Sequence, residues 1–235
     1  MQGSHSMLIG ILETGHVPEP LRDRASGYGD LFERLLAPHG FAFRRWPVVD
    51  MVFPEGPQDA EGWLITGSRH GVYDDLPFIA PLERLIRDIT ASGRPLVGIC
   101  FGHQIIAQAL GGRVHKHPGG WAIGPTDYDF EGRLLRLNAW HQDQVIEPPP
   151  GAETVAGNAF CPHAGLRYGD AALTVQAHPE FDDGFIAGLI EGRGRGLVDD
   201  AVLDAAAARL GRGNDSAVIA ARIAAFLRDP RNRAA

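Results

Sequence analysis

The first half of this sequence alternates short apolar runs with amphipathic segments, and this alternation constrains the fold more than any other feature. Apolar runs of strand length occupy residues 7–12, 41–49, 61–66 and 95–99. Between them, residues 28–36 and 76–92 repeat apolar side chains at helical spacing, and a third helix is expected at about 102–110. Strands that alternate with helices pair in parallel, so we expect an α/β fold whose sheet is covered by helices on both faces.

The second half has a different pattern. Short strand-like segments separated by turn residues occupy 121–130, 134–137, 153–156, 165–168 and 172–177, which favours mixed or antiparallel sheet. From Asp182 the helical pattern returns, including 201–210 and 216–227, so residues 182–235 are expected to be C-terminal covering helices. No repeat or long linker divides residues 7–235, which we expect to form one domain. Residues 1–6 are interpreted as an artificial leader before Met7.

Composition excludes several functional classes. The formal net charge is −7 and Lys116 is the only lysine, so a basic surface for nucleic acid is not expected. No apolar run approaches the roughly 20 residues of a membrane helix, and nothing resembles a secretory signal. The two cysteines, Cys100 and Cys161, cannot form a disulfide framework. We therefore expect a cytoplasmic protein with no nucleic-acid or membrane partner.

The segment Gly98-Ile99-Cys100-Phe101-Gly102 is the strongest chemical signal. A buried strand runs into a cysteine with glycines two residues before and two residues after it, and a helix follows at once. This is the layout of a nucleophile elbow, in which small residues permit a tight turn. The helix N-terminus favours a thiolate at Cys100, and the N–H of Phe101 can face a developing oxyanion. The alternative is an ordinary buried cysteine.

A second segment, His178-Pro179-Glu180, ends the last predicted strand. In an extended chain residues i and i+2 project to the same side, and Pro179 favours an extended His178. Glu180 could then orient the imidazole while its other nitrogen faces a thiol. The alternative is a surface turn, but together with the elbow the pattern indicates a Cys100, His178, Glu180 set.

These motifs resemble those of a known family. Residues 98–104 are similar to the GxCxGxQ elbow of class I (triad) glutamine amidotransferases, and residues 178–180 are similar to their His-x-Glu segment. The resemblance covers roughly residues 7–181 and suggests a stand-alone domain like that of GMP synthase. It implies a flavodoxin-like open mixed sheet. It also implies Cys100 as nucleophile, His178 as general base and acid, and Glu180 as the orienting carboxylate.

The same resemblance implies further site residues. Gly67 and Ser68 lie where the family has a Gly-Gly-Pro loop that supplies a second oxyanion donor, and either N–H could serve. Gln104 matches a position that contacts the amino-acid end of the substrate. The substrate-pocket segment of the family is matched by Trp140, His141 and Gln142. A rival metal site at His115, His117 and His141 lacks convincing ligand spacing, so no metal and no cofactor are expected.

The expected activity is hydrolysis of the glutamine side chain with release of ammonia, through a γ-glutamyl thioester. No ATP-binding signature is present, so a synthetase partner would have to be a separate protein. The alternative is a stand-alone hydrolase of γ-glutamyl peptides or amines with the same three residues. A non-catalytic regulatory module is a third possibility. The expected small molecule is glutamine or another γ-glutamyl compound, and a homodimer is also conceivable.

Overall fold

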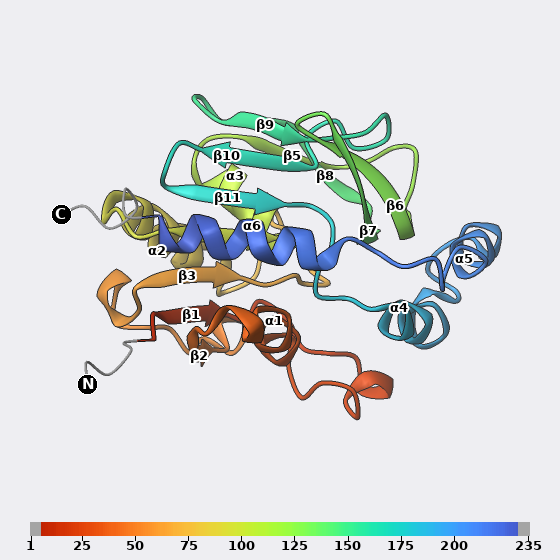
Figure 1. Ribbon diagram of the computed structural model, residues 1–235, viewed down its shortest axis with the longest axis horizontal. Coiled ribbons are helices and arrows are strands. Elements are labelled where there is room, and N and C mark those ends of the chain that lie inside the picture. The colour runs from red at the N-terminus through yellow and green to blue at the C-terminus, as the bar shows by residue number, and fades with distance from the viewer. Residues whose placement is uncertain (1–5, 230–235) are drawn as a thin grey trace.

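Seven strands form one mixed sheet in the computed structural model, which describes residues 6–229 (Figure 1). The strands, in sheet order, are β2 (Ala42–Trp46), β1 (Leu8–Leu12), β3 (Gly62–Ile65), β4 (Leu96–Ile99), β11 (Ala172–Val175), β10 (Gly165–Tyr168) and β9 (Glu153–Ala156). The first five run parallel to one another, and β10 lies antiparallel to both of its neighbours, β11 and β9. This is the flavodoxin-like strand order with an antiparallel extension at one edge.

Two smaller ribbons lie beside the main sheet. Strand β5 (Arg113–Lys116) pairs with β8 (Asp143–Glu147), and β6 (Ala122–Phe130) pairs with β7 (Arg133–His141), both antiparallel. The β6–β7 ribbon touches the segment after β11 through a bridge between Asn138 and His178. The ribbons therefore bring residues 113–147 to the edge of the sheet where the predicted functional segments lie.

Helices cover both faces of the sheet, as the alternating pattern predicted. They are α1 (Tyr28–Leu36), α2 (Ile79–Ala91), α3 (Phe101–Ala109), α4 (Asp183–Leu189), α5 (Asp200–Ala207) and α6 (Ser216–Arg228). Helices α1 and α6 lie on one face and α2 and α3 on the other, while α4 and α5 lie beyond one end of the sheet (Figure 1). Short 3₁₀ turns occupy Glu19–Leu21, Ala37–His39, Val48–Asp50 and Pro57–Asp59, and a π-helical turn occupies Ile190–Gly194.

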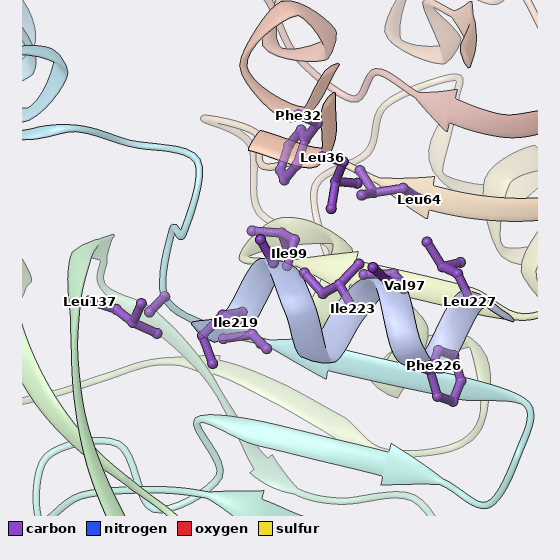
Figure 2. Close-up of a cluster of buried hydrophobic side chains, with 14 of the residues drawn as sticks. Phe32, Leu36, Leu64, Val97, Ile99, Leu137, Ile219, Ile223, Phe226 and Leu227 are labelled. Carbon is purple, nitrogen blue, oxygen red and sulfur yellow. The ribbon is translucent and has the colours of Figure 1, made fainter. Parts of the chain in front are cut away.

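Two of the three buried apolar clusters form layers on opposite faces of the sheet, and the third includes Phe181, Phe185 and Leu203. Figure 2 shows the layer under α1 and α6, which includes Phe32, Leu36, Leu64, Val97, Ile99, Ile219, Ile223 and Leu227. Alternate residues of β3, Trp63 and Ile65, face the opposite layer under α2 and α3. Because successive strand side chains point to opposite faces, the continuous apolar run 62–65 supplies both layers.

The predicted strands and helices are present, with differences at their ends and two omissions. The predicted strand 41–49 ends at Trp46, because Pro47 leads into a 3₁₀ turn. The predicted strand 134–137 extends over all of β7. Strands β5 and β8 are short and largely polar, so neither carries an apolar pattern that could have indicated it. The interpreted leader lies outside the described residues except for Ser6, as do residues 230–235.

Within residues 6–229, every helix is too short or too polar to span a membrane.

Candidate active site

The predicted functional residues meet at the carboxyl ends of three neighbouring parallel strands. Gly67, Cys100 and His178 lie just beyond the ends of β3, β4 and β11, which are adjacent in the sheet. Parallel strands present their carboxyl ends at one edge, where open α/β sheets bind ligands. The topology therefore gathers three segments that lie far apart in the sequence.

Cys100 occupies a strained turn between β4 and α3. Its backbone has φ 53° and ψ −105°, a conformation that residues with a side chain rarely adopt. Its N–H donates a hydrogen bond to the carbonyl of Val175 at 2.9 Å, which ties the turn to β11. Such strain persists only where the surrounding structure enforces it, and it occurs frequently at active sites.

The two glycines that flank Cys100 allow this turn to be tight. A Cβ at Gly98 would lie 2.5 Å from the carbonyl oxygen of Gly102. A Cβ at Gly102 would lie 2.3 Å from the carbonyl oxygen of Ile65. Both distances are far below contact distance, so neither position accepts a larger residue without movement of the backbone. The elbow expected from the sequence is thus present.

His178 and Glu180 form a buried hydrogen-bonded pair beside the thiol. Nδ1 of His178 lies 2.7 Å from Oε1 of Glu180, and the two side chains are 4% and 0% exposed. The imidazole also forms a hydrogen bond with Cys100. Because Nδ1 is engaged by Glu180, Nε2 is the nitrogen left for the sulfur. The extended arrangement predicted from the His-Pro-Glu sequence therefore brings the three side chains together.

The surroundings of His178 favour its protonated form. Burial alone would lower the pKa of His178, but the negative charges of Glu180 and of the Cys100 thiolate, with hydrogen bonds to both, outweigh burial and raise that pKa to about 10. The charged form of the imidazole is therefore favoured when Glu180 and Cys100 are both ionised. A charged pair of this kind is the usual reactive state of a cysteine nucleophile.

Asn138 of β7 holds the His178 segment in place, and sequence analysis did not identify this residue. The carbonyl of Asn138 accepts the N–H of His178 at 2.8 Å. Its side-chain Nδ2 donates to the carbonyl of Phe181 at 2.9 Å. The Phe181 ring in turn stacks on the imidazole. No local motif marks Asn138, because its role depends on the contact between the β6–β7 ribbon and the segment after β11.

The peptide between Gly67 and Ser68 is oriented by two buried threonines. The Thr66 hydroxyl donates to the Gly67 carbonyl at 3.1 Å, and the Thr14 hydroxyl lies 3.0 Å from both the Gly67 and the Thr66 carbonyl oxygens, between which its hydrogen is shared. In a trans peptide the next N–H points away from the carbonyl, so the Ser68 N–H is directed to the side opposite the threonines. A Cβ at Gly67 would lie 2.9 Å from Cε1 of His178 and 3.6 Å from Cβ of Cys100. This loop therefore passes directly beside the thiol and the imidazole.

A pocket opens in front of Cys100, while His178 and Glu180 are buried behind it. It is lined by Ser68, Arg69, His70, Gly71, Tyr73, Asp74, Cys100, Gln104, Lys116, Trp121, Trp140, His141, Gln142, Asp143 and Arg193. The four predicted substrate-binding residues, Gln104, Trp140, His141 and Gln142, are all among them. The side chain of Phe101 instead packs into the core, so only its backbone N–H at the start of α3 can serve the site.

A network of polar contacts forms one wall of the pocket. Nε2 of Gln104 donates to the Asp143 carbonyl at 2.8 Å and to Oε1 of Gln176 at 3.0 Å. The Asp143 carboxylate accepts from the Tyr73 hydroxyl at 2.8 Å and pairs with Lys116 at 3.3 Å. Burial, together with the nearby charge of His178, lowers the pKa of His141 to about 3. His141 is therefore neutral and offers hydrogen bonds rather than charge.

Sequence motifs did not predict the three positively charged side chains of this pocket. Arg69, Lys116 and Arg193 were not assigned to the site. Arg193 lies on the π-helical turn that follows α4. Such turns are rare and frequently occur at functional sites. The available signal was the run Gly192-Arg193-Gly194, which has no helical or strand pattern.

The rival metal ligands and the second cysteine have other contacts. The His117 ring packs against Phe160 at a tilt of 51° with ring centroids 4.3 Å apart, and Nδ1 of His141 faces the Asp143 carbonyl at 3.2 Å. In the described part of the chain, no three His, Cys, Asp or Glu side chains are grouped as a metal site would require. Burial, with a smaller contribution from Cys100, raises the pKa of Cys161 to about 12, so this thiol stays protonated.

Comparison with known proteins identifies the family. The model of the family described as glutamine amidotransferase class-I matches residues 55–185, more than half of the chain. The chain belongs to the class-I glutamine amidotransferase family. The matched residues include the loop at Gly67, the elbow at Cys100 and the pair His178 and Glu180.

Its relatives within this class-I family include two kinds of protein. γ-Glutamyl peptidase 4 of Arabidopsis thaliana is 32% identical over 181 residues, which cover 70% of this chain and 72% of that protein. The glutamine-hydrolysing GMP synthase of Thermus thermophilus is 33% identical over 175 residues, which cover 65% of this chain but 32% of the synthase. Both kinds of relative support a hydrolase of this general type.

Solved structures of glutamine amidotransferases confirm the fold. A glutamine amidotransferase from Thermotoga maritima superimposes with a TM-score of 0.72 at 21% identity, covering 98% of this chain and 100% of that one. A second, from Methylobacillus flagellatus, gives a TM-score of 0.70 at 22% identity, covering 94% and 92%. At these identities the likeness concerns the architecture alone.

Proposed function

We propose that this protein hydrolyses γ-glutamyl amides through a covalent thioester on Cys100. The observation that carries the proposal is the contact of Cys100, in its strained elbow, with the buried pair His178 and Glu180 at the wall of a pocket. A cysteine, a base and a group that orients the base are the components that nucleophilic catalysis requires. The family relationship supports the same chemistry.

In the first half-reaction the Cys100 sulfur attacks the γ-carbonyl carbon and forms a C–S bond. The carbonyl electrons move to oxygen, giving a tetrahedral oxyanion. When that intermediate collapses, the C–N bond breaks and His178 gives its proton to the departing nitrogen. For glutamine the leaving group is ammonia, and the product on the enzyme is a γ-glutamyl thioester.

In the second half-reaction neutral His178 takes a proton from water, and the resulting hydroxide attacks the thioester carbon. Collapse of this second intermediate breaks the C–S bond and releases glutamate and the Cys100 thiolate, beside the reprotonated imidazole. Glu180 holds the imidazole in one orientation throughout and stabilises its charged form. The enzyme thus returns to its starting state with one water consumed.

The oxyanion would be held by two backbone N–H groups, those of Phe101 and Ser68. The N–H of Phe101 is the first of α3 and has no acceptor within the helix. Ser68 is a better second donor than Gly67. The threonine contacts hold the Gly67 carbonyl, and the Ser68 N–H of the same peptide therefore points to the side opposite the threonines. Donors positioned in advance typically contribute about 10²–10³ in rate each.

Two substrates are compatible with this chemistry. Glutamine is supported by the family and by the GMP synthase relative, and it would call for a synthetase partner to use the ammonia. A γ-glutamyl peptide is supported by the γ-glutamyl peptidases of Arabidopsis thaliana, since the chain spans 72% and 75% of two of them but 32% of the synthase. In either case Gln104, Trp140, His141 and Gln142 would bind the glutamyl group.

The test is glutamate release from L-glutamine and, separately, from γ-glutamyl peptides and amines. Cys100→Ala should abolish release, whereas Cys161→Ala, a matched change at the other buried cysteine, should retain it. Trapping the acyl-enzyme and locating the modified residue by mass spectrometry should identify Cys100. Activity that survives Cys100→Ala would show the proposal to be wrong.

A further inference from the structure

Two arginines face the same pocket as Cys100 without a protein partner for either charge. Arg69 follows the oxyanion loop and Arg193 lies on the π-helical turn. Among residues 6–229, no hydrogen bond or ion pair joins either guanidinium to another group. By contrast, the neighbouring Arg195 pairs with three carboxylates, those of Glu191, Asp200 and Asp204.

The carboxylates of the pocket do not neutralise this pair. Asp143 is occupied by Lys116 and the Tyr73 hydroxyl. Asp74 accepts the N–H of Gly71 at 2.9 Å and closes its own turn. Arg193 is half-buried and Arg69 is exposed, and burial together with the charge of Arg69 lowers the pKa of Arg193. A half-buried guanidinium without a protein partner, in the same pocket as a second positive charge, is stabilised when an anion binds beside it.

Arg193 lies on the side of the thiol from which the leaving group departs. The π-helical turn that carries Arg193 follows directly after α4, whose Phe185 stacks on Phe181. Phe181 is in turn stacked on His178. Arg193 is therefore on the His178 side of Cys100. Because His178 gives its proton to the departing nitrogen, the leaving group must occupy this side.

We propose that Arg69 and Arg193 form a binding site for a carboxylate carried by the leaving group. On the proposed function, the preferred substrate is then a γ-glutamyl amino acid or peptide, and glutamine or a simple γ-glutamyl amine lacks the group that these arginines bind. The planar guanidinium donates two parallel hydrogen bonds to a carboxylate, a match that an uncharged amide does not reproduce. The inference rests on the proposed function for the position of the leaving group.

The decisive comparison uses γ-glutamyl-alanine and γ-glutamyl-alaninamide, which differ only in the carboxylate in question. Binding of both is measured by calorimetry on Cys100→Ala, and turnover on the protein with Cys100 intact. Arg193→Gln and Arg69→Gln are compared with Arg195→Gln, a matched change two residues from Arg193 at an exposed ion-paired position.

The acid should bind at least about tenfold more tightly than the amide, as expected for a charge-assisted hydrogen bond. Arg193→Gln should remove most of this preference by raising KM for γ-glutamyl-alanine at nearly constant kcat. Arg193→Gln should leave the KM for γ-glutamyl-alaninamide unaffected. Arg195→Gln should change the KM of neither compound. Equal binding of acid and amide, or no binding of either, would overturn the proposal.

Two further outcomes separate the possible errors. Equal weakening of acid and amide by Arg193→Gln would place the arginines at the α-carboxylate of the glutamyl group and would overturn the inference alone. A clear preference for the acid in binding, with no turnover that depends on Cys100, would support the carboxylate site and contradict the proposed function instead.

Discussion

The imidazole of His178 lies flat on the ring of Phe181, with centroids 4.0 Å apart and planes 4° from parallel. Phe181 is itself stacked on Phe185 of α4, and its carbonyl is bound by Asn138. The base therefore has fixed contacts on its face as well as at Nδ1. A protonated imidazole on an aromatic face also gains a cation–π interaction.

Phe181→Leu should lower kcat about tenfold, with a smaller effect on KM, because the imidazole loses the contact that fixes its plane. Phe185→Leu is the matched control, since Phe185 is equally buried but touches the other face of Phe181. Both variants should lose similar stability in urea unfolding. A similar fall in kcat for both would show that the stack has no specific role in positioning the base.

Glu180→Gln should move the alkaline limb of the pH–rate profile to lower pH. The Glu180 charge is the largest contribution that raises the pKa of His178, and without it burial would lower that pKa. Glu191→Gln, at an exposed carboxylate, should leave the limb where it is. An unchanged limb in Glu180→Gln would contradict the assignment of Glu180 as the orienting group.

The same charges link His178 to stability. Because the pKa of His178 is raised from 6.5 to about 10 on folding, its protonation stabilises the fold fully below about pH 6.5, and this contribution is lost as the pH rises through about 10. The unfolding free energy of the wild-type protein should therefore fall across this window. Glu180→Gln should flatten the decline, as measured by urea unfolding at a series of pH values.

Thr14→Val should reduce kcat about tenfold at nearly constant KM, since it removes one of the two hydroxyls that orient the Gly67–Ser68 peptide. The change keeps the side-chain shape but puts a methyl group in place of the hydroxyl, so the Gly67 and Thr66 carbonyls lose this donor. Thr90→Val on α2, whose hydroxyl bonds to carbonyls of its own helix, is the control. If kcat is unchanged in Thr14→Val, the threonine contacts do not position the proposed donor.

Gly98→Ala should impair both folding and reaction of the thiol with alkylating glutamine analogues, because its Cβ would overlap the Gly102 carbonyl. We expect a loss of roughly 1–3 kcal/mol, as is usual for overpacking a rigid site. Gly192→Ala is the control, since its Cβ would meet Pro20 at 3.4 Å, an ordinary contact. A fully stable and reactive Gly98→Ala protein would mean that the elbow is looser than described.

Patterns that depend on local sequence predicted most of the fold. Strands β1, β3 and β4 and helix α1 have periodic or continuous apolar runs, which directly reflect burial on one or both faces. Strands β5 and β8 have no such signal, because they pair with each other in a ribbon that buries few side chains. Local pattern thus identifies elements of the main sheet better than those at its margin.

The residues of the candidate site also fall into two groups, those that local sequence indicated and those that it did not. Cys100, His178 and Glu180 were singled out because turn chemistry and spacing indicate an elbow and an oriented base, and the structure brings the three together, although their roles remain predictions. Asn138 and Arg193 were missed. Each contributes through a contact between segments that are distant in sequence, and nothing in the neighbouring residues indicates it.

The backbone at position 100 has a further consequence for the evolution and engineering of this protein. A φ of 53° with a ψ of −105° suits glycine and costs a residue with a side chain about 1–3 kcal/mol. Glycine at this position would give a more stable and chemically inert fold. Stability and the proposed reactivity thus favour different residues at one site, so selection for heat resistance alone would tend to remove the proposed nucleophile.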